Sequence, residues 1–311
     1  MAFAAGFVSL LVLRVLLGTG ETIAFPGGSK IISRHVGPER RGMANSALAL
    51  GIALGPALGT LAGGLILASL GWRAIFIAFG LVTLVWLLPW RSAVRGLGDA
   101  AMDREPRVPV RQLVGKWSLW SMSIAHVASN FVFYFLLGWL PLFLTKSRGL
   151  PIAEMTLIAT LGYAAQAIAA LAFGHFSDRW SGGRWTEGAV RRWMMVAGQI
   201  LAAVAVFGLP YADSRTMLGL LLVLAGIATG ALSLNTYAVA QMFSGPRAAG
   251  TWVGIQNAVG NMSGIFGPIV TGIIVQQAGF SMACWLTAAV AAFGALWWIV
   301  GVPTIREIEL D

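Results

Sequence analysis

Two charged residues, Arg14 and Glu21, lie within an otherwise apolar stretch near the beginning of the chain. A charge inside a membrane-spanning segment is costly, so it is by default a candidate functional residue. Seven residues correspond to about two helical turns, which places both side chains on one helix face about 10 Å apart along the axis. This spacing allows them to bracket a bound anion or to meet through water. It equally allows a structural role, in which they neutralise each other and hold neighbouring helices in register.

Glu21 has the chemistry of a proton carrier. A neighbouring cation stabilises a buried carboxylate, and an anion that binds Arg14 competes for that cation and favours protonation of Glu21. Proton and solute would then move together in the same direction. We therefore predict that Glu21 and Arg14 couple proton movement to transport and that Arg14 also binds the anion.

Uncharged polar residues recur at helical spacing in three later apolar segments, where a polar stripe should face a cavity or a partner helix. Asn, Gln and Tyr supply hydrogen-bond donors and acceptors without charge, which suits the hydroxyls and carboxylates of a small polar solute. Hydrogen bonds between helices also explain each stripe alone, whereas several converging stripes favour a polar cavity. His126 is better explained as a hydrogen-bonded packing residue than as a proton carrier. The stripes consist of Ser123, His126, Asn130 and Tyr134; of Ser233, Tyr237 and Gln241; and of Asn257 and Asn261.

The composition is that of a polytopic membrane protein. Hydrophobic residues make up 58% of the chain and charged residues 11%, with a mean hydropathy of +0.79, whereas soluble domains contain about 25% charged residues. The net charge of +9 does not indicate a nucleic-acid partner, because the basic residues cluster in short loops between apolar segments. One cysteine, Cys284, and three scattered histidines give neither a disulfide framework nor zinc-site spacing. No phosphate-binding loop or hydrolase signature is present, so we expect no enzyme, no cofactor and no metal site.

A bilayer needs about 20 mainly apolar residues per helix, and this length predicts nine membrane spans. They cover residues 3–32, 43–69, 73–90, 117–145, 152–176, 188–211, 215–243, 249–276 and 280–302. The first span is long enough to require tilt or a bend, which Pro26 with Gly27 and Gly28 can supply. The longest polar interval separates three spans from six. The predicted domains are an amino-terminal helix bundle of residues 1–92, a cytoplasmic linker of residues 93–115 and a carboxy-terminal six-helix bundle of residues 116–311.

The distribution of basic residues predicts the orientation in the membrane. Alternate loops divide the 21 lysines and arginines into 16 on one side and four on the other, with Arg14 inside a span. The richer side, which includes the carboxy terminus, is expected to be cytoplasmic. The chain as given then begins on the outside, which is unusual for a transporter with an even number of helices. We therefore expect further sequence upstream.

An internal repeat supports this expectation. Residues 37–64 and 244–272 each begin with a basic Gly-Pro loop and continue as a helix with a glycine every three or four residues. Both then pass through a two-residue turn, Gly71-Trp72 or Gly279-Phe280, into a last helix. The first three spans therefore match the last three, as in transporters built from repeats with a site at the midplane between halves. If each half has six helices, the amino half here lacks its first three.

Four motifs resemble one family of transporters. RVLLGTGETIAFPG (14–27), followed by GPERRGMANS (37–46), resembles the fourth helix and the next loop of the major facilitator superfamily, and more narrowly of its anion:cation symporter branch. NFVFYFLLGWLP (130–141) is similar to the seventh helix and GIQNAVGNMSGIFGPIVTG (254–272) to the eleventh. GHFSDRWSGGR (174–184) is similar to the second-half copy of the superfamily's signature loop. The resemblance covers essentially the whole chain.

The resemblance implies an all-α polytopic membrane protein with the major facilitator fold, of which this chain would contain nine of twelve transmembrane helices, the fourth to the twelfth. It implies alternating access and proton symport of a small organic anion, such as a sugar acid or another carboxylate. The expected surroundings are the lipid bilayer of a bacterial inner membrane, with a monomer as the expected state. The implied site residues are Glu21 and Arg14 for proton coupling; Arg14, Asn130, Tyr134, Asn257 and Asn261 for substrate binding; and Asp178, Arg179 and Arg184 in the gating loop.

Two departures from the family pattern keep alternatives open. GIALGPALG (51–59) fits a GxxxGPxxG pattern associated with antiporters of the superfamily, which favours a proton-driven exporter or exchanger, although close helix packing also explains it. The expected absence of three helices, together with the first-half signature loop, leaves the cavity incomplete. A start codon placed too late and a transport-inactive remnant are both compatible with that absence.

Overall fold

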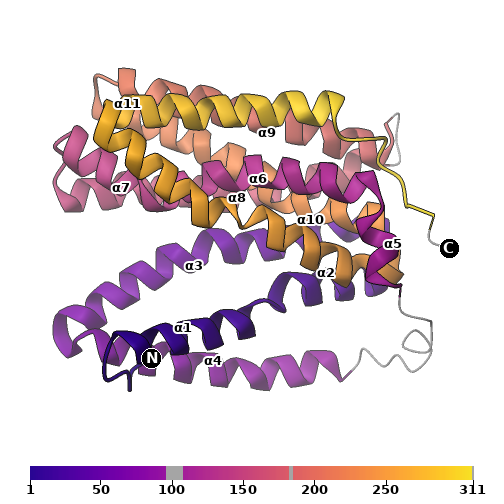
Figure 1. Cartoon of the computed structure of the whole chain (residues 1–311), viewed down its shortest axis with the longest axis horizontal. Helices are drawn as coiled ribbons and strands as arrows, with labels where there is room; N and C mark the ends of the chain where they lie inside the picture. The colour runs from indigo at the N-terminus through magenta and orange to yellow at the C-terminus, as the bar shows by residue number, and fades with distance from the viewer. Residues whose placement is uncertain (96–107, 182–184, 310–311) are drawn as a thin grey trace. The chain divides into compact units, whose positions relative to one another are not determined.

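The computed structural model describes residues 1–95, 108–181 and 185–309. These residues are mainly α-helical, with short 3₁₀ and π-helical turns between long helices (Figure 1). They divide into two compact units, of which unit 1 contains residues 1–24 and 55–107 and unit 2 contains residues 25–54 and 108–311. Much of the predicted linker, residues 93–115, lies outside the described residues. The domain organisation predicted from the sequence therefore remains a prediction.

Unit 1 is built from α1 (Phe7–Glu21), the second part of α3 (Arg41–Leu70) and α4 (Trp72–Val94). Its helices are apolar, yet α1 and α4 contain no buried residue. Gly71 joins α3 to α4 with φ +81°, a backbone conformation that glycine adopts without strain. Arg73 follows, with its guanidinium 4.4 Å from the centre of the Trp72 ring. Exposed apolar helices of this length are typical of segments that lie in a lipid bilayer.

The first predicted span, residues 3–32, is not one helix. α1 ends at Glu21 and α2 (Ala24–His35) begins three residues later. The predicted bend is present, and it lies four residues before Pro26, at Thr22. A proline ring clashes with the carbonyl four residues earlier and removes a backbone hydrogen bond. Pro26 therefore interrupts the helix at Thr22 and itself lies in the first turn of α2, where a missing amide hydrogen is tolerated.

Unit 2 contains most of the chain. Its main helices are α2, the first turns of α3, α6 (Trp117–Gly138), α8 (Ile152–Trp180), α9 (Glu187–Gly208), α10 (Arg215–Gly260) and α11 (Ser263–Val300). Short elements join them, namely η1 (Pro38–Arg40), α5 (Val110–Val114), α7 (Leu140–Leu142), the π-helical η3 (Phe143–Ser147) and η4 (Leu209–Tyr211). α10 packs along α6, α8 and α9, and α11 packs along α6 and α9 (Figure 1).

α10 and α11 each contain one glycine with non-helical backbone. Gly245 has φ +61° and Gly279 has φ +82°. Both kinks lie at boundaries predicted between membrane spans. Among the described residues, seven helical stretches are long and apolar enough to cross a membrane, and the last runs through both kinks from Arg215 to Val300. A count of nine spans requires dividing this stretch at its two glycines, and it stays a prediction.

A further break lies inside the predicted span of residues 249–276. α10 ends at Gly260, and α11 begins at Ser263 after a turn at Asn261 and Met262. The Asn261 side chain folds back onto α10, where its Nδ2 donates to the Asn257 carbonyl at 2.9 Å. This span is therefore not one continuous helix, and an asparagine occupies the interruption.

Two large apolar clusters and a small one, which consists of Ala49, Ala170 and Leu234, form the core of unit 2. The first includes Val132, Phe135, Phe143, Leu144, Leu209 and Leu222. The second includes Leu119, Met122, Met195, Phe243, Trp252 and Trp298. Along α6 and α9, polar residues separate the two clusters, and the buried Gln199 donates from Nε2 to the Ser129 hydroxyl at 2.8 Å. The predicted substrate residue Asn130 directly follows Ser129 and so belongs to this polar layer.

Candidate functional site

The interruption between α10 and α11 is the centre of a polar cluster in unit 2. The Asn261 side-chain oxygen accepts from Asn130 Nδ2 at 3.1 Å and from Tyr134 Oη at 2.8 Å. Asn130 and Tyr134 are one turn apart on α6, so the same helix face supplies both donors. Gly264 makes this approach possible, because a Cβ there would lie 2.5 Å from the Tyr134 ring. The structure thus brings together three of the residues predicted to bind substrate.

Asn257, the fourth neutral residue predicted to bind substrate, lies one turn before the interruption on α10. Its side-chain oxygen accepts from Tyr237 Oη at 3.1 Å. Phe25 of α2 stacks on the Tyr237 ring, with centroids 4.8 Å apart and planes 5° from parallel. The buried His126 ring meets Tyr237 edge-on at 5.9 Å, which agrees with the packing role expected for this histidine. Amides, phenols and aromatic faces gather here, and such groups suit a hydroxylated solute.

Arg14 and Glu21 lie together on α1 in unit 1, as their spacing predicted. Both side chains are exposed. Within the part of the chain that the structure describes, neither forms an ion pair or hydrogen bond. Their roles in proton coupling and anion binding remain predictions from the sequence.

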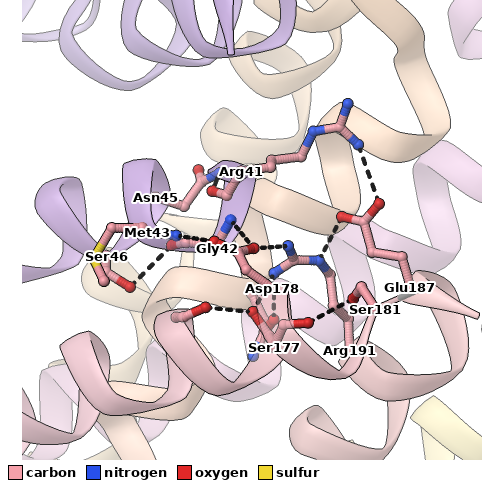
Figure 2. Close-up of polar contacts among 12 residues, drawn as sticks. Arg41, Gly42, Met43, Asn45, Ser46, Ser177, Asp178, Ser181, Glu187 and Arg191 are labelled. Atoms are coloured by element: carbon pink, nitrogen blue, oxygen red, sulfur yellow. Dashed lines mark hydrogen bonds and ion pairs between the residues drawn. The ribbon is translucent and has the colours of Figure 1, made fainter. Parts of the chain in front are cut away.

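Asp178, predicted in the gating loop, lies in the last turn of α8 and caps the start of α3. Its two carboxylate oxygens accept from the backbone amides of Gly42 at 2.7 Å and Met43 at 2.8 Å (Figure 2). The first amides of a helix have no partner within the helix and carry partial positive charge, so a carboxylate satisfies both needs. Asp178 therefore connects α8 to the start of α3.

Arg191 completes this contact from α9. The guanidinium donates from Nε to Glu187 at 2.9 Å and from Nη2 to Asp178 at 3.5 Å (Figure 2). Its Nη1 donates to Asn235 at 3.2 Å. Glu187 also pairs with Arg41 at 3.6 Å. The Arg191 side chain is 0% exposed. Such a charge is tolerated only where partners surround it.

The sequence analysis did not identify Arg191 as a site residue. α9 begins at Glu187, so Arg191 lies in its second turn and points into unit 2. A signal was available, because an acid four residues before an arginine on a helix forms a favourable pair. The other predicted gating residues contribute less. Arg179 is exposed and forms no ion pair with the described residues, and Arg184 lies outside them.

The start of α3 makes two further contacts that the sequence did not reveal. Asn45 and Gln241 are both buried and exchange two amide hydrogen bonds of 3.0 Å each. Ser46 donates to the Ala170 carbonyl at 2.6 Å. Gly42 and Gly174 let the two backbones approach, since a Cβ on Gly42 would lie 2.6 Å from the Gly174 carbonyl oxygen. In unit 2, the start of α3 is thus fixed to both α8 and α10.

A separate cavity of about 700 Å³ opens between α8, α9 and α10. Its lining is apolar and includes Phe173, Trp180, Trp185, Trp193 and Met194. None of the predicted substrate residues belongs to it. We therefore do not assign an anion to this cavity, because its lining offers almost no hydrogen-bond partners.

The sequence is similar to those of known transporters. A family model described as Major Facilitator Superfamily matches residues 1–187 and 149–309. The chain is 26% identical to the hexuronate transporter of Bacillus subtilis, over 99% of this chain and 78% of that protein. It is also 26% identical to the D-galactonate transporter of Escherichia coli, over 98% of this chain and 77% of that protein. Both relatives are named as transporters. Separately, among the residues that the structure describes, no group of three or more His, Cys, Asp or Glu side chains could hold a metal ion.

Plant relatives match over a smaller share of their length. The chain is 24% identical to sodium-dependent phosphate transport protein 1 of Arabidopsis thaliana, over 94% of this chain and 60% of that protein. The chain thus spans about 60% of the length of this curated relative. Among solved structures, the human organic anion transporter MFSD10 superposes with a TM-score of 0.72 at 19% identity, covering 96% of this chain and 72% of that one. This likeness concerns the fold alone.

Proposed function

Because the chain belongs to the Major Facilitator Superfamily, we propose that it is part of a secondary transporter that moves a small organic anion inward together with protons by alternating access. The chain is an integral membrane protein of a transporter family rather than an enzyme. The proposed substrate is a sugar acid or a related carboxylate. The proposed arrangement is nine of the twelve helices of the family fold, in a bacterial inner membrane with the carboxy terminus in the cytoplasm.

The observation that carries this proposal is the neutral hydrogen-bonding cluster at the interruption between α10 and α11. Asn261 gathers Asn130 and Tyr134 around one oxygen atom, and all three are residues that the sequence predicts to bind substrate. Interrupted helices commonly form the solute sites of transporters. Two relatives carry the names hexuronate transporter and D-galactonate transporter, and both solutes combine hydroxyls with a carboxylate. We propose that the cluster binds the hydroxyls of the solute, while anion binding by Arg14 of unit 1 stays a prediction from the sequence.

We further propose that unit 2 represents the conformation closed at the predicted cytoplasmic side. Three contacts support this assignment: Asp178 with the start of α3, Asn45 with Gln241, and Phe25 with Tyr237. Each joins the early helices α2 and α3 to α8 or α10. Alternating access would require these contacts to open when the solute is released inward.

The test is uptake of radiolabelled hexuronates and D-galactonate into proteoliposomes under an inward proton gradient. The protein should include whatever sequence precedes this chain in its gene. We expect accumulation that an uncoupler abolishes, and we expect Glu21→Gln to abolish accumulation while retaining exchange of labelled for unlabelled solute. Accumulation by Glu21→Gln at the level of the unchanged protein would exclude Glu21 as the proton carrier.

The cluster is tested separately with a matched pair of tyrosine variants. Tyr134→Phe removes the hydroxyl that donates to Asn261, and we expect the half-saturating substrate concentration to rise about tenfold, as for the loss of a hydrogen bond to a polar site. Tyr163→Phe makes the same chemical change on α8, where the structure describes no hydrogen bond from the hydroxyl, and should leave uptake unchanged. Solute export driven by the same gradient, in place of uptake, would favour the exchanger that residues 51–59 suggest.

A further inference from the structure

The segment after α11, residues 301–309, folds back onto α9 and α10 instead of extending away from them. Arg192 of α9 holds its beginning, with Nη2 donating to the carbonyls of Val302, at 2.9 Å, and of Pro303. Ile305 then lies against Gly188, where a Cβ would come within 2.9 Å of the isoleucine. Glycine at this position of α9 therefore leaves the space that the segment occupies. We call residues 301–309 the return segment.

The return segment ends on the kink of α10. The backbone amide of Ile308 donates to the Phe243 carbonyl at 2.9 Å. The Glu307 carboxylate lies directly against Gly245 and occupies the space that a Cβ on Gly245 would need. Gly245 has φ +61° and is followed by Pro246, and here the chain reverses. Tyr237 bonds to Asn257 and Gln256 bonds to Thr236, so the two parts of α10 pack side by side across this turn.

Apolar side chains of the return segment pack against a cluster whose members come from both parts of α10. Ile305 and Ile308 pack against the apolar cluster that contains Phe243, before the kink, and Trp252, after it. These two aromatic rings stack with centroids 5.8 Å apart and planes 11° from parallel. A change of angle at Gly245 would separate the rings and expose the isoleucines. The return segment therefore stabilises one angle of the kink.

Both parts of α10 also contact the early helices of unit 2. Before the kink, Gln241 pairs with Asn45 and Tyr237 stacks on Phe25. After the kink, the Pro246 carbonyl accepts from Arg34 Nε at 3.5 Å, and a Cβ on Gly250 would contact the Pro26 carbonyl at 3.5 Å. The angle at Gly245 decides whether both parts can hold α2 and α3 simultaneously.

We propose that the return segment is a strap that holds the α10 kink in the angle required by the closed contacts with α2 and α3. Opening those contacts then requires the strap to loosen from Phe243 and Gly245. The inference rests on the proposed function only in assigning this opening to the transport cycle. The mechanical coupling itself follows from the contacts within unit 2.

The experiment measures amide hydrogen exchange by mass spectrometry on the full protein in lipid nanodiscs. The strap variant is Ile305→Ala with Ile308→Ala, and the matched control is Ile299→Ala with Val300→Ala, two exposed residues at the end of α11. We expect exchange in residues 241–250 and 25–46 to accelerate on the order of tenfold in the strap variant only, because local opening follows local stability. Faster exchange confined to residues 301–309, or no difference from the control, would overturn the strap.

A second pair of variants covers the case in which the double substitution prevents folding. Glu307→Ala removes only the carboxylate that lies against Gly245, whereas Glu309→Ala removes an exposed carboxylate two residues later. Faster exchange at residues 243–247 in Glu307→Ala alone supports the strap, and equal exchange in the two variants overturns it. Solute uptake is measured on the same samples. If the strap variants show the expected faster hydrogen exchange but the unchanged protein takes up none of the acids, the strap is supported and the proposed function is excluded.

Discussion

The two Gly-Pro loops of the internal repeat start two helices that are held in different ways. After Gly37-Pro38, the start of α3 is capped by Asp178, which is itself paired with the buried Arg191. After Gly245-Pro246, the second part of α10 is held by the apolar return segment and by stacked aromatic rings. The backbones differ accordingly, since Gly37 has φ −63° and Gly245 has φ +61°.

This difference shows how one repeated motif acquires two roles. Two helices that are joined by a capping carboxylate can separate. Water can then form hydrogen bonds with both the carboxylate oxygens and the backbone amides. Buried apolar packing has no such alternative partner in water. We therefore expect the start of α3 to open first and the two parts of α10 to stay packed until the return segment loosens.

The largest effect is expected from Arg191→Met. Methionine keeps much of the side-chain length but leaves Asp178 and Glu187 facing each other without their shared cation. Breaking a buried ion pair in this way destabilises by about 3–5 kcal/mol. The measurement is the free energy of unfolding by denaturant titration in mixed micelles. Arg179→Met, on the exposed neighbour of Asp178, is the control and should change it by less than about 0.5 kcal/mol. A loss below about 1 kcal/mol for Arg191→Met would mean that the network does not hold α3.

The next largest effect is expected from alanine substitutions at Gly42 and Gly250. Each lies five residues after the glycine of its Gly-Pro loop, so the two positions are equivalent in the repeat. A Cβ on Gly42 would lie 2.6 Å from the Gly174 carbonyl oxygen and would also meet Asp178 and Ser177. A Cβ on Gly250 would meet nothing closer than 3.5 Å. We expect Gly42→Ala to destabilise by about 1–3 kcal/mol through overpacking. Gly250→Ala should be neutral or stabilise by up to about 1 kcal/mol, as for alanine in a helix.

The same denaturant titration reports both alanine variants. Equal losses at the two positions would contradict the distinction between a crowded and an open helix start. Uptake sharpens the comparison, because Gly42→Ala should also slow transport if the start of α3 must close against α8. Gly250→Ala should leave transport unchanged.

The sequence predicted well those features that depend on local chemistry. Apolar length predicted helices long enough to cross a membrane, of which the described residues contain seven. The repeat predicted turns at Gly71 and Gly279, which have φ +81° and +82°. The sequence also grouped Asn130, Tyr134 and Asn261, which the structure joins by hydrogen bonds, while their role in substrate binding stays a prediction. Side-chain type and helical spacing are enough for such predictions, because neighbours on one helix face share one environment.

Features that depend on contacts between distant segments were missed. In the sequence, Arg191 is one of several arginines near the end of a predicted span. Only the fold shows that α8 supplies Asp178 and α10 supplies Asn235 as its partners. The sequence of the return segment does not predict a packed segment, yet Ile305 and Ile308 pack against an apolar cluster. Neither residue spacing nor composition encodes which surface a segment meets.

A smaller effect is expected at the amide pair. Position 45 corresponds to Val253 in the second repeat, so Asn45→Val makes the first helix start resemble the second. The substitution leaves the buried Gln241 amide without a partner, which should destabilise by about 1–3 kcal/mol. Adding Gln241→Leu removes the orphaned amide and should recover most of that loss, because replacing both partners is nearly neutral. Strictly additive losses in this double-mutant cycle would show that the two amides do not interact in the membrane.

The smallest effect tests where the two repeats are alike. Gly71 and Gly279 have the same backbone conformation, and a Cβ on either would meet no atom within 4 Å. Alanine at these positions therefore introduces backbone strain without a steric clash, which destabilises by about 1–2 kcal/mol. The losses in free energy of unfolding should agree within about 0.5 kcal/mol, the usual limit for independent sites. Gly80→Ala, in a helical position of α4 with equal space, is the control and should be neutral or slightly stabilising. Unequal losses would mean that the turns, like the two helix starts, have diverged in what holds them.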